Sequence, residues 1–124
     1  MSGSDRILLD SNIIIYLSQG KLFIDDVFAS NGDYAISLIT YMEILSYRFT
    51  SREEEDFIHQ LLSLFTVIDI DKEIAEAVIR LRKRRKIKLP DAVIVATAQV
   101  YNLILYTNDK QLHGIESLTT KFFD

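Results

Sequence analysis

The sequence has 124 residues, which fits a single domain. Hydrophobic residues make up 48% and charged residues 26%, so the composition is typical of a globular protein and not of a disordered chain. The absence of cysteine excludes disulfides, thiol catalysis and cysteine-ligated metal centres. Only two histidines are present, His59 and His113, so a His-rich metal site or a Ser-His-Asp triad is poorly supported. Any metal in this chain would need mainly oxygen ligands, which favours Mg²⁺ or Mn²⁺.

The formal net charge of −4 is unevenly distributed. Seven of the 14 basic residues form a basic cluster: Arg80, Arg82, Lys83, Arg84, Arg85, Lys86 and Lys88. Removing these seven positive charges leaves −11 on the rest of the chain. The cluster could follow an RNA backbone, with contacts from Arg82, Arg84, Arg85 and Lys86, or it could be a solvated helix end favoured by the helix dipole. Both interpretations stay open at this point.

No apolar run reaches the roughly 18–20 residues that are needed to cross a bilayer. The N-terminus is polar and lacks the apolar core of a signal peptide. We therefore predict a soluble cytoplasmic protein without a membrane partner. Residues 1–5 are interpreted as a flexible leader and residues 6–124 as the folded domain.

In the first half of the chain, short apolar segments alternate with helical patterns. Residues 6–9 predict a buried strand, and Ser11 or Asn12 can cap a helix that runs through residue 17. Residues 22–29 predict a short helix and residues 34–36 a strand. Ser37 can cap a helix to about residue 49, with an apolar face of Leu38, Tyr41, Met42 and Leu45.

The second half continues the alternation. Ser51 and Glu54 form a capping box that opens a helix, residues 66–70 predict a strand, and Asp71 can cap the helix that enters the basic cluster. Pro90 fits the first turn of a helix that is apolar nearly all round, so that helix should be buried. Residues 103–106 and 117–120 predict the last strands. The pattern predicts an α/β fold: one domain with a mostly parallel central sheet of four or five strands and helices on both faces.

Acidic residues fall where parallel strands end. Asp10 follows the first strand and Asp109 follows a later one, so both should lie at the same edge of the sheet. Asp91 lies in the first turn of the most apolar helix. Glu43 lies among apolar neighbours in its helix and should be partly buried. Taken singly, Asp10 could be a helix cap, Asp91 a dipole partner and Asp109 a turn residue.

Four carboxylates in one hollow would repel one another by several kcal/mol unless a positive charge compensates. No arginine or lysine cluster accompanies these four, so a divalent cation is the simplest compensating charge. Two such ions about 3.5–4 Å apart would suit phosphoryl chemistry, in which one activates water and the other stabilises the leaving oxygen.

Four segments carry a resemblance to a known family: LLDSNIIIYL (residues 8–17), ITYMEIL (39–45), LPDAVIVATA (89–98) and LYTND (105–109). In order and spacing the chain resembles PIN-domain ribonucleases, most closely the VapC-like toxins of type II toxin–antitoxin pairs. Each motif alone is weak, whereas the ordered set is fairly specific and spans nearly the whole chain. Val93 and Val95 are a mild departure, since smaller or other aliphatic residues are frequent at those positions.

The resemblance implies a fold and a chemistry. Asp10, Glu43, Asp91 and Asp109 would be the catalytic acidic quartet that binds Mg²⁺ or Mn²⁺, and Asn12 and Thr107 would support it by hydrogen bonds. The family hydrolyses RNA phosphodiester bonds with metal-activated water, leaving 5′-phosphate and 3′-hydroxyl ends. Its toxins usually form homodimers and are held inactive by a cognate VapB-like antitoxin.

Two other functions remain as alternatives at this stage. A phosphotransfer domain, receiver-like or dehalogenase-like, would use Asp69 or Asp71 as acceptor, but it leaves Glu43 and Asp91 without a role and lacks the second acid of a dehalogenase motif after Asp10. A catalytically silent PIN fold that serves as an interaction module would not need the intact quartet.

Overall fold

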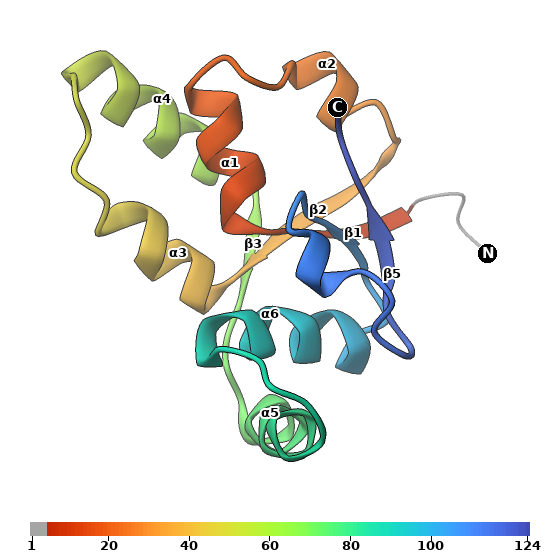
Figure 1. The fold of residues 1–124 in the computed structure, drawn as a ribbon. Coiled ribbons are helices and arrows are strands. Elements are labelled where there is room, and N and C mark those ends of the chain that lie inside the picture. The colour runs from red at the N-terminus through yellow and green to blue at the C-terminus, as the bar shows by residue number, and fades with distance from the viewer. Residues whose placement is uncertain (1–4) are drawn as a thin grey trace.

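The computed structural model describes residues 5–124 and contains a five-stranded sheet in which every pairing is parallel. The strands are β1 (Asp5–Leu9), β2 (Gly32–Ser37), β3 (Thr66–Ile68), β4 (Ile104–Tyr106) and β5 (Thr119–Lys121), in the spatial order β3-β2-β1-β4-β5 (Figure 1). The chain moves outward in one direction from β1 to β3 and in the other from β4 to β5. The gap between the ends of β1 and β4 is therefore the topological switch point, where α/β sheets place their ligands.

Helices cover both faces of the sheet, which confirms the predicted fold class. They are α1 (Ser11–Ser18), α2 (Ile24–Val27), α3 (Leu38–Leu45), α4 (Arg52–Leu62), α5 (Lys72–Arg84) and α6 (Leu89–Val100), with a 3₁₀ turn η1 (Lys110–Leu112). Figure 1 shows α5 and α6 on one side of the sheet and α1 and α4 on the other. No helix among residues 5–124 is long and apolar enough to cross a membrane.

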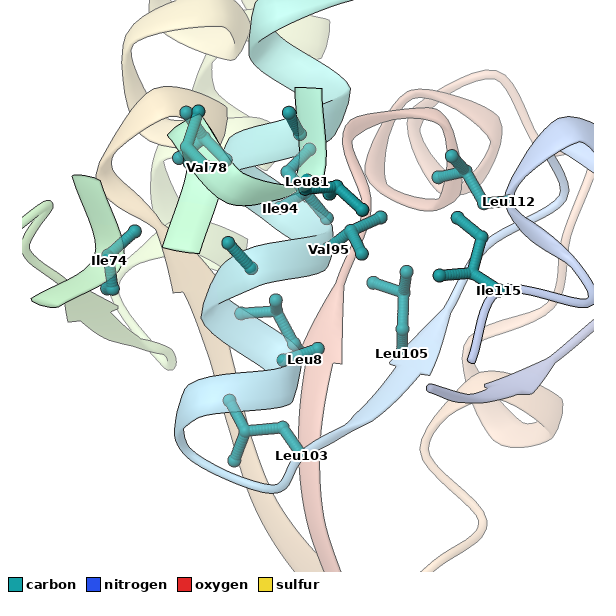
Figure 2. Packing of buried hydrophobic residues seen from close by; sticks show 14 of the residues in the cluster. Leu8, Ile74, Val78, Leu81, Ile94, Val95, Leu103, Leu105, Leu112 and Ile115 are labelled. Atoms are coloured by element: carbon teal, nitrogen blue, oxygen red, sulfur yellow. The ribbon is translucent and has the colours of Figure 1, made fainter. Parts of the chain in front are cut away.

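The alternation of side chains along the strands builds two cores. Leu8 of β1 and Leu105 of β4 point toward α5 and α6, where they meet buried residues such as Ile94 (Figure 2). Ile7 and Leu9 point to the opposite face and pack with α1 and α4. Both faces of β1 are thus buried, which explains its continuous apolar sequence and holds the residue that follows it in a fixed position.

Most predicted helix starts are confirmed by their capping bonds. Ser37 accepts a hydrogen bond from the Ile39 N–H at 3.2 Å, Ser51 from the Glu54 N–H at 3.1 Å, and Asp71 from the Ile74 N–H at 2.8 Å. Pro90 lies in the first turn of α6, and the seven residues 92–98 are all buried, as predicted.

The cap of α1 differs from the prediction. Asp10 is the N-cap, and its Oδ1 accepts from the Ser11 N–H at 2.7 Å, so neither Ser11 nor Asn12 has this role. The helix therefore begins one position earlier than a cap at Ser11 would place it and two earlier than a cap at Asn12 would, and Asp10 has the cap role that the sequence also allowed.

The third helix is shorter than predicted. It ends at Leu45 and not near Phe49, because Phe49 leaves the helical path to pack against the core formed with α1 and α4. Tyr41 and Met42, predicted on an apolar face, are 38% and 46% exposed.

Other boundaries shift by a few residues. The helix predicted at 22–29 is limited to Ile24–Val27, the strand predicted at 34–36 extends to Gly32–Ser37, and the strands predicted at 66–70, 103–106 and 117–120 are Thr66–Ile68, Ile104–Tyr106 and Thr119–Lys121. Of the predicted leader, residues 1–4 lie outside the described residues, whereas Asp5 pairs with Gly32 and belongs to the sheet.

Candidate active site

Asp10 occupies the switch point between β1 and β4. Its side chain is only 5% exposed, its Oδ1 accepts from the Ser11 N–H, and its Oδ2 accepts from the Thr107 hydroxyl at 2.6 Å. Burial raises the pKa of Asp10 from its ordinary 3.8 to about 6; the two hydrogen bonds oppose this rise, and the charges of Asp91 and Asp109 add to it. Asp10 is therefore both a helix cap and a buried, destabilised anion.

Thr107 links the ends of the two central strands. It is fully buried after β4, donates to Asp10, and accepts from the Asp109 N–H at 3.0 Å. A threonine hydroxyl can donate one hydrogen bond and accept others, so this single side chain aligns two of the predicted acids.

A second set of bonds holds the loop after β4 in place. The Asn12 Oδ1 accepts from the Asn108 N–H at 3.4 Å. The Asn108 side chain bonds to the Phe123 backbone in both directions at 2.8 Å, donating to the carbonyl and accepting from the N–H. Asn12 and Asn108 thus anchor this loop between α1 and the C-terminal segment.

Asp91 and Asp109 approach the site from α6 and η1. Asp91 is half-buried, and its pKa is raised first by desolvation and then by the charges of Asp109 and Glu43, while Lys88 lowers it. Asp109 is the N-cap of η1 and accepts from the Gln111 N–H at 3.0 Å. The electrostatic influence of these acids on one another places them around one region of the surface.

Glu43 lies at the outer edge of this region and is exposed, so the prediction that it would be partly buried was wrong. Its neighbour Ile44 is buried but Met42 is not, because α3 turns only one side to the core. The Ser11 hydroxyl donates to Glu43 Oε1 at 2.9 Å and lies 3.4 Å from the buried Thr40 hydroxyl. Ser11 therefore connects Glu43 to the loop that holds Asp10.

The carboxylates share a region without forming a tight cluster. Among residues 5–124, no group of three or more acidic or histidine side chains lies close enough together to hold a metal ion in the positions shown. Electrostatic influence extends beyond ligand distance, so the mutual pKa effects and the absence of such a group are compatible. The donor set consists of carboxylate oxygens, which suits a hard divalent cation.

The basic cluster divides between different surfaces. Arg82, Arg85, Lys86 and Lys88 line a cavity of about 450 Å³ that Asp91 and Gln111 also border. Arg84 lies with Arg80 in a second cavity of about 570 Å³ against Glu116 and Ser117, which Arg85 also borders but Asp91 does not. The structure therefore brings three of the four predicted RNA-binding side chains next to an acid of the site and leaves Arg84 apart from it.

Sequence reasoning missed the contributions of Ser11, Asn108 and Lys88 to the site. Ser11 was interpreted as a cap, and Lys88 only as one cation among seven. Ser11 and Asn108 lie directly beside a predicted acid in the sequence, as in Asp10-Ser11 and Asn108-Asp109, and this was the available signal for them. Their contacts with Glu43 and Phe123 depend on the fold.

A family model described as "PIN domain" matches residues 7–118. The chain belongs to the PIN-domain family. This agrees with the ordered set of motifs and with the placement of their acids around the switch point. The predicted resemblance to VapC-like PIN ribonucleases is confirmed at the level of the family and its structural relatives.

Solved structures extend the comparison to nearly the full chain. A toxin–antitoxin complex from Klebsiella pneumoniae contains a chain 40% identical to this one, with a TM-score of 0.78 and coverage of 92% of this chain and 96% of that chain. VapBC-1 from nontypeable Haemophilus influenzae matches at 25% identity and a TM-score of 0.76, covering 94% and 96% of the two chains. VapBC2 from Rickettsia felis, bound to a promoter DNA fragment, shares the fold at 24% identity and a TM-score of 0.80, with coverage of 95% and 98%. The search of curated proteins found no match.

The phosphotransfer alternative fits this PIN domain poorly. Asp71, one of its two acceptor candidates, caps α5 and accepts a hydrogen bond from the Tyr101 hydroxyl at 2.7 Å. These bonds lower the pKa of Asp71, and its carboxylate is engaged as the cap of α5 and as the partner of Tyr101.

Proposed function

We propose that this PIN domain is a metal-dependent endoribonuclease and the toxin component of a cytoplasmic toxin–antitoxin pair. The observation that carries the proposal is the buried Asp10 carboxylate at the switch point, with its pKa near 6 and with Asp91 and Asp109 adding negative charge beside it. A protein that keeps a costly anion in this position needs it for binding a cation or for chemistry.

We infer that Mg²⁺ or Mn²⁺ would be held by Asp10, Glu43, Asp91 and Asp109. Asp10 has both oxygens engaged but retains lone pairs for a ligand, since an ionised carboxylate offers about four acceptor sites. The other three acids are half-buried or exposed, so their carboxylates are accessible to a cation. A bound cation would supply the Lewis acidity that activates water and stabilises the leaving oxygen of the phosphodiester.

The chain's own residues position these groups. Thr107 and the Ser11 N–H hold Asp10 in one orientation and oppose the rise of its pKa, which keeps most of the carboxylate ionised near pH 7. Ser11 restrains Glu43, and Asn12 and Asn108 fix the loop that carries Asp109. Arg82, Arg85 and Lys86 lie where they can hold the phosphates of an RNA strand beside Asp91.

The proposed partners are a VapB-like antitoxin and a second copy of this chain. The Klebsiella pneumoniae match is a toxin–antitoxin complex, and it covers nearly the whole of both chains. An antitoxin that covers the acidic region would keep RNA away from it, and a basic side chain of the antitoxin would be attracted to the carboxylates there. Homodimer formation and the cytoplasmic location remain predictions.

The test is RNA cleavage by Asp91→Asn. This substitution keeps the size of the side chain and removes the charge, so Mg²⁺- or Mn²⁺-dependent cleavage of a labelled RNA should fall at least about 100-fold while the protein stays folded. Asp25→Asn is the matched control, because Asp25 is also in the first turn of a helix but is exposed on α2. Cleavage by Asp91→Asn at the wild-type rate would refute the role of Asp91.

The same assay separates the nuclease from a silent interaction module. Cleavage by the wild-type chain should stop in EDTA and return with Mg²⁺ or Mn²⁺, and the products should carry 5′-phosphates. If the wild-type chain binds its antitoxin but cuts no RNA with either metal, the silent PIN module is the correct interpretation.

A further inference from the structure

The cations of the basic cluster lack acidic partners. Among residues 5–124, the only pair of oppositely ionisable side chains within 4.0 Å is His59 with Glu55 on α4, far from the cluster in sequence. Arg85 is the C-cap of α5, and Lys86 and Lys88 follow it; all three are exposed. The helix dipole favours the cations at the helix end, Arg82 to Arg85, but it does not account for Lys86 and Lys88. Their positive charge is available to an external anion.

These three residues converge on one cavity. The cavity of about 450 Å³ lies between the end of α5, the start of α6 and η1, and its rim includes Asp91 of the candidate active site. Ile87 and Leu112 give it an apolar floor, and Gln111 adds one neutral hydrogen-bonding side chain. The mixture of cations, an apolar surface and an amide suits a nucleotide, whose phosphate, ribose and base need these three kinds of contact.

Two local features lie beside this cavity. Arg82 donates from Nε to the Ile87 carbonyl at 3.2 Å and so links the last turn of α5 to the segment that precedes α6. The first turn of α6 has no side-chain cap at Lys88, so the positive end of its dipole faces the same region.

We propose that this cavity is a phosphate subsite that binds the RNA nucleotide next to the bond that is cut, with Arg85, Lys86 and Lys88 on its phosphate and Gln111 on its base or ribose. This inference rests on the proposed nuclease function and deepens it. It narrows the predicted RNA contacts to the residues that share a cavity with Asp91, and it assigns Lys88 and Gln111 to substrate binding.

The separate placement of the other cations supplies a control. Lys83 is an exposed basic residue of the last turn of α5 that does not border the cavity with Asp91. It borders a neighbouring hollow with Val78 and Ile79, which Arg85 and Lys86 also line but Asp91 does not. Lys83→Ala and Arg85→Ala each remove one positive charge at the end of α5. Only Arg85→Ala removes it from the cavity with Asp91. The two variants therefore separate a specific contact from a general loss of positive charge.

The first experiment measures binding of a short fluorescent single-stranded RNA by anisotropy in EDTA, where no cleavage occurs. Arg85→Ala and Lys86→Ala should each weaken binding about fivefold at 0.1 M salt and lower the salt slope by about 0.7, the value for one lost single-strand phosphate contact. Lys83→Ala should weaken binding less than twofold. Equal losses for Lys83→Ala and Arg85→Ala would overturn the subsite.

The second experiment locates the phosphate. RNAs that carry one uncharged methylphosphonate at each position in turn are bound to the wild-type chain and to Arg85→Ala. We expect one position, adjacent to the cut, at which the neutral linkage weakens RNA binding by the wild type. At that position it should not weaken binding by Arg85→Ala any further, because the contact with the phosphate is already lost. Equal additional losses in both proteins at every position would overturn the proposal.

The outcomes also separate this inference from the proposed function. If the wild-type chain cuts no RNA with Mg²⁺ or Mn²⁺, the nuclease function fails, and the subsite as a place beside the cut fails with it. If the wild-type chain cuts RNA but no methylphosphonate position couples to Arg85, the nuclease function stands and only the subsite is rejected.

Discussion

Asp10→Asn should make the metal-free protein more stable at neutral pH. Asp10 is buried, and desolvation raises its pKa from 3.8 to about 6. Between pH 3.8 and about 6 the folded state keeps a proton on Asp10 that the unfolded state has released. The free energy of unfolding of the wild type therefore carries no penalty from Asp10 below pH 3.8, and it falls as the pH rises through about 6. Asparagine does not titrate, so the variant lacks this loss.

The size of the effect follows from the pKa. A rise from 3.8 to about 6 corresponds to about 3 kcal/mol of unfolding free energy lost by the time Asp10 is fully ionised. Asparagine has one acceptor oxygen for the two donors, the Ser11 N–H and the Thr107 hydroxyl, and losing one of these bonds costs about 1 kcal/mol. The net expectation is a gain of about 2 kcal/mol near neutral pH.

Urea unfolding in EDTA, measured from about pH 4 to about pH 7.5, tests this reasoning. The difference in unfolding free energy between variant and wild type should grow in favour of the variant as the pH rises. Asp25→Asn, an exposed acid on α2, makes the same chemical change away from the site and should follow the wild-type curve. Parallel curves for Asp10→Asn and wild type would refute the destabilised-anion interpretation.

Three further substitutions test the hydrogen bonds around the site and the sheet that carries it. Thr107→Val removes one donor to the buried carboxylate and one acceptor of a backbone N–H, so it should cost about 1–3 kcal/mol in urea unfolding; a neutral effect would contradict the bridging role. Asn108→Ala should release the backbone of Phe123 and speed amide hydrogen exchange there, and unchanged exchange would argue against the tether. Gly32→Ala places a Cβ against the carbonyl oxygen of Asp5 between β1 and β2, so the thermal midpoint should fall by an amount equivalent to about 1–3 kcal/mol; an unchanged midpoint would contradict that close approach.

Patterns of local chemistry explain the successful sequence predictions. Ser37, Ser51 and Asp71 cap helices because a short polar side chain can reach the free N–H groups of the first turn, a property that depends on neighbouring residues only. The uninterrupted apolar run of α6 predicts burial on all sides for the same local reason.

The exposure of Tyr41, Met42 and Glu43 on α3 could not be predicted from local sequence patterns. Tyr41, Met42 and Leu45 repeat at helical spacing, yet Tyr41 and Met42 face outward because the sheet and α1 leave room for only one side of this helix. An apolar stripe indicates that a surface can be buried, but only the positions of the neighbouring elements determine whether it is.

The sequence by itself determined the class of fold and most of the helix caps, and it supplied the prediction of the four acids, since these depend on residue type, spacing and the order of motifs along the chain. Tertiary structure decided how Asp10 and Thr107 meet, which cations share a cavity with Asp91, and that Arg84 does not. The physical reason is that pKa values, hydrogen bonds and cavities depend on distances between residues nearly a hundred positions apart, and these distances exist only after the strands are paired.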